Sequence, residues 1–147
     1  MTPVVEVRDL TKEFKSRAAS GVHLAVDQVS FAVEDGESFG IVGESGSGKT
    51  TVSRILLGLV APTSGSATVC GIDVWNSSRN ERKQLPGLVQ VVFQDPYSSM
   101  NPRMTIERIL LEGVRARIEK PARRAEAERL LELVGLPGRY ASLHPYQ

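Results

Sequence analysis

Alternating apolar and polar positions in the first part of the chain predict two antiparallel strands. Residues 4–10 alternate in this way, and residues 26–33 do so again with Val29 among their inward positions. The polar and basic stretch at residues 15–21 is typical of an exposed loop. We therefore expect the two strands to pair across this loop, with one face toward a core.

Two nearly continuous apolar runs predict strands that are covered on both faces. Residues 38–42 form the first run, after a turn expected at residues 34–37, and residues 88–93 form the second. Such runs are typical of parallel strands inside an α/β sheet. Residues 62–65 predict another turn, and residues 66–74 a strand that returns to the antiparallel layer.

Helical spacing of apolar residues appears in three segments, at residues 51–59, 105–114 and 121–135. Residues 76–84 are polar and predict a loop or a short helix. The second helix begins after a cap at Thr105, and charged residues of the third helix are expected on a solvated face. The positions expected to be buried are Val52, Ile55, Leu56 and Leu59 in the first helix, and Leu130, Leu133 and Val134 in the third.

The segment between residues 38–42 and the first helix has the pattern of a phosphate-binding loop, Gly-Glu-Ser-Gly-Ser-Gly-Lys-Thr. Its glycines let backbone N–H groups turn inward and approach a polyphosphate, and the helix dipole adds to the attraction. We expect Lys49 to neutralise the β- and γ-phosphates and the hydroxyl of Thr50 to ligate Mg²⁺. The nucleotide-binding residues expected here are Gly43, Glu44, Ser45, Gly46, Ser47, Gly48, Lys49, Thr50 and Thr51.

Composition and charge narrow the function classes. The 18 basic and 17 acidic residues nearly cancel, so nothing favours general nucleic-acid binding, and we expect no nucleic-acid partner. The longest apolar stretch, residues 55–61, is too short to span a bilayer, and the charged N-terminal segment is unlike a signal peptide, so we expect a cytoplasmic protein. Cys70 is the single cysteine, which excludes an internal disulfide; we expect it to be a small buried side chain without function.

Together with the segment after residues 88–93, the loop makes the chain resemble the nucleotide-binding subunits of ABC transporters. Residues 92–96, Val-Phe-Gln-Asp-Pro, match the so-called Q-loop of that family, with Gln94 at its centre. Residues 97–105 look most like the branch that takes up dipeptides, oligopeptides or nickel. The resemblance runs in order from residue 4 to residue 147.

The resemblance implies an α/β P-loop NTPase fold with a flanking antiparallel β layer. It places the β layer and P-loop core at residues 1–94, and the Q-loop and the start of a helical subdomain at residues 95–147. It implies ATP and Mg²⁺ as ligands, with Phe14 stacked on adenine; a core phenylalanine is the alternative. Gln94 is expected to complete the Mg²⁺ shell or hold the attacking water, so that Lys49 and Gln94 are the catalytic candidates; a residue that only caps a strand end is the alternative for Gln94.

The resemblance also implies partners and a location. Such subunits hydrolyse ATP as a dimer, so a second ATP-binding subunit, identical or not, and transmembrane permease subunits are expected. The chain is then expected in the cytoplasm, peripheral on the inner face of the cell membrane.

The end of the sequence departs from the family pattern. Residues 144–147 are what such proteins have directly before their signature loop, and that loop, the aspartate strand and the later catalytic glutamate and switch histidine do not follow. His144 is not that histidine, and we expect it to be an exposed loop residue. The fold is therefore expected to be truncated before the second half of the core sheet, and the chain alone to fold poorly or associate and to be inactive in hydrolysis.

Two other classes of function stay open at this point. One is a non-hydrolytic nucleotide-binding fragment or regulatory module, which phosphate release would distinguish from an ATPase. The other is a soluble P-loop kinase or GTPase, although the Asn-Lys-x-Asp segment that reads guanine occurs nowhere in the chain.

Overall fold

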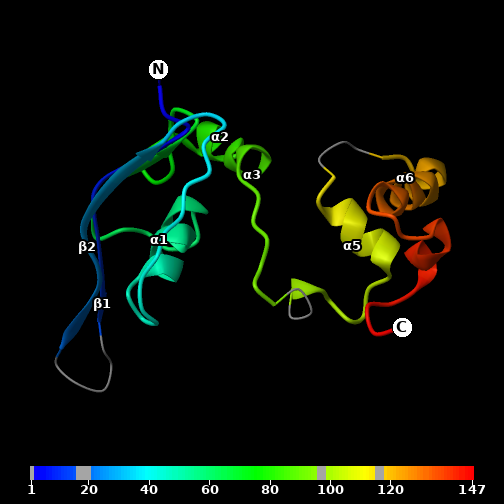
Figure 1. The fold of residues 1–147 in the computed structure, drawn as a ribbon. Helices are drawn as coiled ribbons and strands as arrows, with labels where there is room; N and C mark the ends of the chain where they lie inside the picture. The colour runs from blue at the N-terminus through cyan, green and yellow to red at the C-terminus, as the bar shows by residue number, and fades with distance from the viewer. Residues whose placement is uncertain (1, 16–20, 96–98, 115–117) are drawn as a thin grey trace. The chain divides into compact units, whose positions relative to one another are not determined.

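The structure is a computed structural model that describes residues 2–15, 21–95, 99–114 and 118–147 (Figure 1). The chain divides into two compact units, Met1–Gln90 and Val91–Gln147. The boundary expected at residues 94 and 95 stays a prediction.

The first unit is built on a four-stranded antiparallel sheet with the strand order β2-β1-β3-β4. Strand β1 (Val5–Lys15) pairs with β2 (Val22–Val33) on one side and with β3 (Ser64–Val69) on the other. The predicted pairing of residues 4–10 with residues 26–33 is confirmed, and both strands are longer than predicted. Residues 16–20 of the expected loop lie outside the described residues.

The strand predicted over residues 66–74 is instead a hairpin. Strand β3 ends at Val69, and the short strand β4 (Ile72–Asp73) pairs back on it. Cys70 and Gly71 between them have φ values of 47° and 78°, as a tight two-residue hairpin turn requires. The turn tip is exposed, so Cys70 is an exposed thiol and the expectation that it is buried was wrong.

Helix α1 (Lys49–Leu56) packs on this sheet and closes the core of the first unit. Val52 and Ile55 are its buried residues, as predicted. Leu59 is exposed, contrary to prediction, because the helix ends earlier. Gly58 has a φ of 70°, and the N–H of Leu59 donates to the carbonyl of Arg54 at 2.9 Å, an arrangement typical of a helix C-terminus. The core consists of Val7, Leu10, Val26, Val52, Ile55, Ala67, Val69 and Val74.

A side-chain hydrogen bond connects the segment after β4 to the last turn of α1. The indole N–H of Trp75 donates to the carbonyl oxygen of Ile55 at 3.1 Å. Asp73 Oδ1 accepts the N–H groups of Trp75 and Asn76, both at 2.8 Å, and so holds the turn that presents the indole. Partial burial opposes the charged carboxylate, but these hydrogen bonds outweigh it, so the pKa of Asp73 lies below its ordinary value.

Neither of the two predicted buried strands forms in the described part of the chain. Residues 38–42 have no regular structure, and Val42 is 95% exposed. In the second run, helix α3 (Leu85–Leu88) takes the first residue, and residues 89–93 have no regular structure, with Val92 97% exposed. A parallel strand is held by hydrogen bonds from neighbouring strands. No described strand pairs with either segment, so most of their apolar side chains remain exposed, although Val89 packs against the core.

The shorter connections follow the local sequence signals. The expected turn at residues 34–37 is confirmed, with the N–H of Glu37 donating to the carbonyl of Glu34 at 3.2 Å. Helix α2 (Arg79–Arg82) confirms a short helix within residues 76–84. It begins with a capping box in which Ser78 and Glu81 exchange hydrogen bonds between side chain and backbone.

The second unit packs two helices and a short 3₁₀ segment. Helices α5 (Ile106–Glu112) and α6 (Lys120–Leu133) confirm the two predicted helices, and η1 (Gly138–Ser142) follows. The predicted buried stripe of α6 was wrong at Leu133 and Val134, which are 68% and 71% exposed, whereas Leu130 is half-buried. Segment η1 packs on another face of α6, where small side chains allow close approach. The core residues of this unit are Ala127, Leu131 and Ala141.

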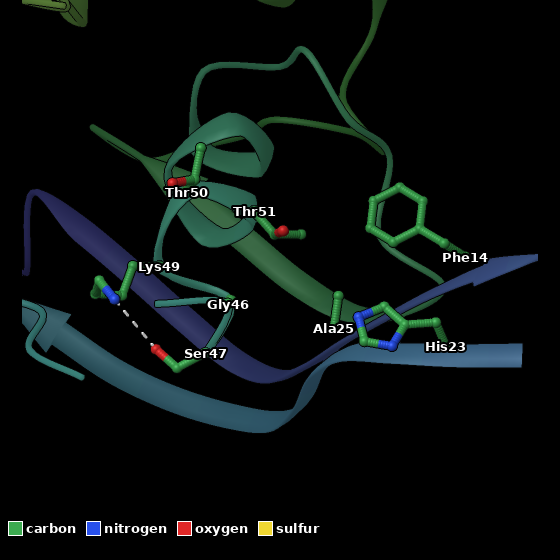
Figure 2. A pocket seen from close by; sticks show the side chains of 9 residues that line it. Phe14, His23, Ala25, Gly46, Ser47, Lys49, Thr50 and Thr51 are labelled. Carbon is green, nitrogen blue, oxygen red and sulfur yellow. Dashed lines mark hydrogen bonds between the residues drawn. The ribbon is translucent and has the colours of Figure 1, made fainter. Parts of the chain in front are cut away.

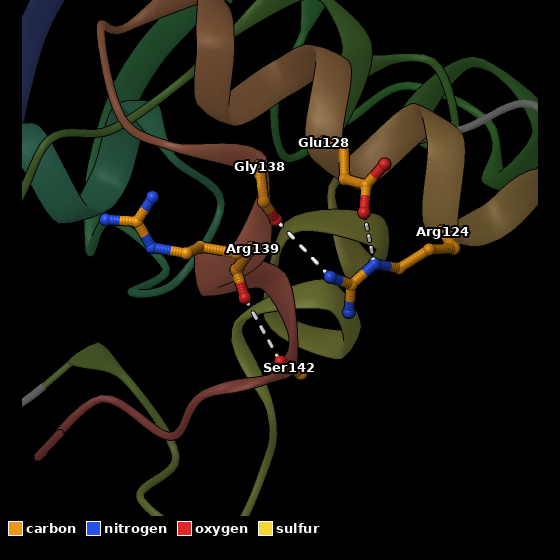
Figure 3. A network of polar contacts seen from close by, with 5 residues as sticks. All are labelled: Arg124, Glu128, Gly138, Arg139 and Ser142. Carbon is orange, nitrogen blue, oxygen red and sulfur yellow. Dashed lines mark hydrogen bonds and ion pairs between the residues drawn. The ribbon is translucent and has the colours of Figure 1, made fainter.

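Polar contacts reinforce the packing of η1 on α6 (Figure 3). Arg124 Nε lies 2.5 Å from Glu128 Oε1, and Arg124 Nη2 donates to the carbonyl of Gly138 at 3.5 Å. A Cβ on Gly138 would lie 3.1 Å from Glu128 Cβ, so this position favours glycine. The solvated face predicted for α6 is confirmed only in part, because Arg123 and Arg129 are exposed whereas Arg124, Glu126 and Glu128 are half-buried. No helix in the described ranges is long and apolar enough to cross a membrane.

We predict that Asp73→Ala lowers the free energy of unfolding by about 1–2 kcal/mol, because two backbone N–H groups lose a charged acceptor. Urea denaturation would measure the loss, with Asp35→Ala in the exposed turn as the control. Since the folded-state pKa of Asp73 is depressed, its contribution is fully present above the ordinary value of 3.8 and is lost as the pH falls through the folded-state pKa. A difference that grows on acidification would contradict this assignment.

Candidate functional site

The glycine-rich loop is shaped by its contact with strand β2. Gly48 stands at the N-cap of α1 with a φ of 94°, and a Cβ there would lie 2.2 Å from the carbonyl oxygen of Ala25. No other residue fits so close to this backbone. Gly46 also has a positive φ, 84°, but a Cβ there would meet nothing within 4 Å. Gly48 is therefore required by packing and conformation, and Gly46 by conformation.

The ammonium group of Lys49 lies inside the curve of the loop. Its Nζ donates to the carbonyl oxygens of Gly43 at 2.7 Å and Glu44 at 2.6 Å, and it lies 3.3 Å from Ser47 Oγ. Figure 2 shows the last of these contacts. A positive charge thus lies beside the first turn of α1, whose N–H groups have no partner within the helix.

A hollow of about 190 Å³ extends from the loop to the β1–β2 pair (Figure 2). At one end Phe14 of β1 and His23 of β2 lie together, since they are cross-strand partners. At the other end lie the loop and the start of α1. The nine lining residues are Phe14, His23, Ala25, Gly46, Ser47, Gly48, Lys49, Thr50 and Thr51.

The charge of this lining fits an anion. Lys49 contributes a cation, the N-terminus of α1 contributes the positive end of the helix dipole, and none of the nine described lining residues is acidic. The described residues also contain no cluster of three or more His, Cys, Asp or Glu side chains that could hold a metal ion. A cation in this hollow would therefore need oxygen ligands from a bound anion as well as from the chain.

Phe14 is exposed at the end of the hollow, with 41% of its surface accessible. It is therefore not a core phenylalanine, which was the alternative to the stacking role. Lys12 Nζ lies 5.0 Å from the centroid of its ring, within the range of a cation–π contact. A flat aromatic surface thus stands opposite the cationic end of the hollow.

The structure brings together most of the residues that the sequence predicts. Phe14 and residues 46–51 line the hollow, and Gly43 and Glu44 contact Lys49 through their carbonyls. Ser45 lies in the turn of the loop and is exposed. Gln94 is exposed in the second unit, where residues 96–98 of the expected Q-loop lie outside the described residues, so its role stays a prediction.

Sequence reasoning missed His23 and Ala25. Both lie on β2, and their place in the site depends on the register that pairs His23 with Phe14. The signal that could have found them was the alternation of β2, once its start had been placed at Val22 and its register fixed against β1.

A second hollow, of about 560 Å³, lies between β2, α1 and residues 39–43. It is mostly apolar, and the rings of Phe31 and Phe39 stack beside it with centroids 4.9 Å apart. Its lining includes Phe39, Ile41 and Val42 of the run at residues 38–42, which the sequence predicts to be a buried strand.

Comparison with known proteins identifies close similarity to one family. A family model described as "ABC transporter" matches residues 26–146. The putative oligopeptide transport ATP-binding protein YkfD of Bacillus subtilis (strain 168) is 40% identical over 148 residues, which cover 99% of this chain and 45% of that protein. The di/tripeptide transport ATP-binding protein DppF of Pseudomonas aeruginosa (strain UCBPP-PA14) is 37% identical, with 99% and 47% covered.

Solved structures show the same likeness. The ATP-binding cassette MJ0796, in a dimeric post-hydrolysis state bound to ADP and Pi, has a TM-score of 0.74 and 26% identity. That match covers 97% of this chain and 62% of the cassette.

The chain spans about half the length of the two curated relatives described above.

We predict that Gly48→Ala destabilises the first unit more than Gly46→Ala does. Both variants place alanine at a positive φ, which costs about 1 kcal/mol or more. The added methyl group at position 48 also meets the carbonyl of Ala25, which adds about 1–3 kcal/mol. Urea denaturation of the two variants would measure the difference, and equal losses would show that the close approach to β2 does not matter.

Proposed function

The chain belongs to the ABC transporter family, and we propose that its hollow binds MgATP as part of an ATPase that drives the import of peptides. One observation carries the proposal: Lys49 at the N-terminus of α1 and the exposed ring of Phe14 lie at opposite ends of one hollow. A nucleoside triphosphate has the same polarity, with dense negative charge at one end and a flat base at the other.

The phosphate end of the proposed site is the glycine-rich loop. Phosphate oxygens would accept N–H groups from the loop and from the first turn of α1. Lys49 already lies there, and its longest contact, to Ser47 Oγ at 3.3 Å, is the one that a phosphate oxygen would most readily replace. The lysine would keep its contacts with the carbonyls of Gly43 and Glu44, so that binding would need little rearrangement.

The base end of the proposed site is Phe14. Stacking of a base on an aromatic ring contributes about 1–3 kcal/mol and tolerates different bases. The hollow of about 190 Å³ is partly open rather than enclosed. We infer that part of the nucleotide would remain open to solvent or to another surface.

Mg²⁺ would be shared between the nucleotide and the chain. The hydroxyl of Thr50 is a hard oxygen ligand at the start of α1, and Mg²⁺ usually keeps phosphate and water oxygens as its other ligands. The resemblance to the family supports Gln94 as a second ligand or as the group that positions water. In this proposal Lys49 stabilises charge on the phosphates during transfer.

Transport is proposed from the relatives. Two of them are named as oligopeptide and di/tripeptide transport proteins, which supports peptide uptake over nickel uptake. The dimeric cassette among the solved structures supports a second ATP-binding subunit. We propose that the protein acts with permease subunits, peripheral on the inner face of the membrane. A binding module without hydrolysis is the alternative, and phosphate release with MgATP, measured in the presence of the proposed partner subunits, would distinguish the two.

We predict that Lys49→Ala removes detectable ATP binding, a loss of about a hundredfold or more in affinity, because the phosphates lose their cation. Titration with a fluorescent ATP analogue would measure it. Arg54→Ala is the matched control, since it removes one positive charge from an exposed position on the same helix. Unchanged affinity in Lys49→Ala would overturn the assignment of the loop to phosphate.

We predict that Thr50→Val lowers the gain in ATP affinity on adding Mg²⁺ by about tenfold, because the metal loses a ligand from the chain. Affinity in the presence of a chelator should stay close to that of the wild type. Ser53→Ala is the control, because its hydroxyl donates to the carbonyl of Lys49 within α1. If both variants kept the full effect of Mg²⁺, Thr50 would not be a ligand.

A further inference from the structure

His23 is the polar side chain at the aromatic end of the hollow. It lies on β2 directly opposite Phe14 on β1, and both residues line the hollow. Figure 2 shows the imidazole and the phenyl ring together, with Lys49 at the other end. The glycine-rich loop therefore accounts for one end of the hollow, and the pair of Phe14 and His23 for the other.

The two residues differ in what they offer a ligand. The ring of Phe14 offers an apolar face, and its orientation is supported by Lys12 at 5.0 Å from the centroid. An imidazole offers hydrogen-bonding nitrogens: in its neutral form one donates and the other accepts. The ribose hydroxyls and the edge of a base have donors and acceptors that match an imidazole. A phosphate chain bound at the loop would place its charge at the end of the hollow away from His23.

We propose that His23 is a nucleoside-contacting residue, which hydrogen-bonds the ribose or the base edge of a nucleotide whose phosphates lie on the glycine-rich loop. The inference rests on the proposed function and adds a residue to the nucleoside end of the site. It assigns His23 to the recognition of the nucleoside and not of the polyphosphate. His23 is exposed on its strand, so the contact adds to binding while the fold of the sheet does not depend on it.

A structural role for His23 makes a different prediction. If His23 served only to pack beside Phe14, its removal would shift the pair of strands. The shift would reach the loop through the contact of Ala25 with Gly48, and it would lower the affinity of every ligand bound at the loop by the same factor. If His23 contacts the nucleoside, its removal would lower the affinity only of ligands that carry a nucleoside. Inorganic tripolyphosphate carries the phosphates alone, so it separates the two roles.

The test measures the dissociation constants of ATP and of tripolyphosphate, each with Mg²⁺, for the full chain by calorimetry. We expect His23→Ala to raise the dissociation constant of ATP about threefold to tenfold, the usual effect of losing one hydrogen bond at an accessible site. The dissociation constant of tripolyphosphate should stay within about twofold of the wild-type value. His23→Gln keeps a donor and an acceptor and should restore most of the ATP affinity. Val22→Ala, at the neighbouring exposed position of β2, is the control and should change neither constant.

The outcomes are distinct from those that test the proposed function. Equal weakening of ATP and tripolyphosphate by His23→Ala, or unchanged affinity for both, would overturn the role of His23 while wild-type binding of ATP upheld the proposed site. A loss for ATP that His23→Gln does not restore would also overturn it, because the hydrogen bond would not be its cause. If the wild-type chain bound neither ligand, the proposed function itself would fail, and the role of His23 with it.

Discussion

The close contact between Gly48 and the carbonyl of Ala25 is the constraint on which the rest of the site depends. It places the start of α1 against β2 at a separation that any side chain at position 48 would prevent. The burial of Val52 and Ile55 in the core then fixes the axis of the helix on the sheet. Since β2 also carries His23, and its pairing with β1 places Phe14, one packing contact sets the distance between the cationic and aromatic ends of the hollow.

The features that the sequence predicts well are those that short-range spacing determines. The glycine-rich loop, the helix that follows it and the pairing of β1 with β2 each follow from patterns within a few residues. The same holds for the turn at residues 34–37 and for α6, which ends before Gly135 with its φ of 76°. Two of the three glycines of the loop have a positive φ, Gly46 and Gly48, and at Gly48 close packing against β2 adds to it. The local structure of the glycine-rich loop could therefore be predicted in large part.

The features that the sequence predicts poorly depend on partners far along the chain. Residues 38–42 and 88–93 have the composition of buried strands, but composition supplies no neighbouring strand, and neither segment has one among the described residues. The buried face of α6 was misjudged for a similar reason: Ala127 is covered because η1 packs there, which hydrophobicity alone does not show. His23 escaped notice because its place depends on the register of β2 against β1.

The two halves of the glycine-rich loop are held by different interactions. Its second half continues into α1 and is anchored by the core through Val52 and Ile55. Its first half follows residues 38–42, which make no ladder hydrogen bonds in the described structure, so it is held by Lys49 on the carbonyls of Gly43 and Glu44 and by the stack of Phe39 on Phe31. Local opening should therefore begin in the first half. The residue that would bind phosphate is thus also the residue that holds the loop together, so occupation of the loop by an anion would stabilise the segment with the fewest other contacts.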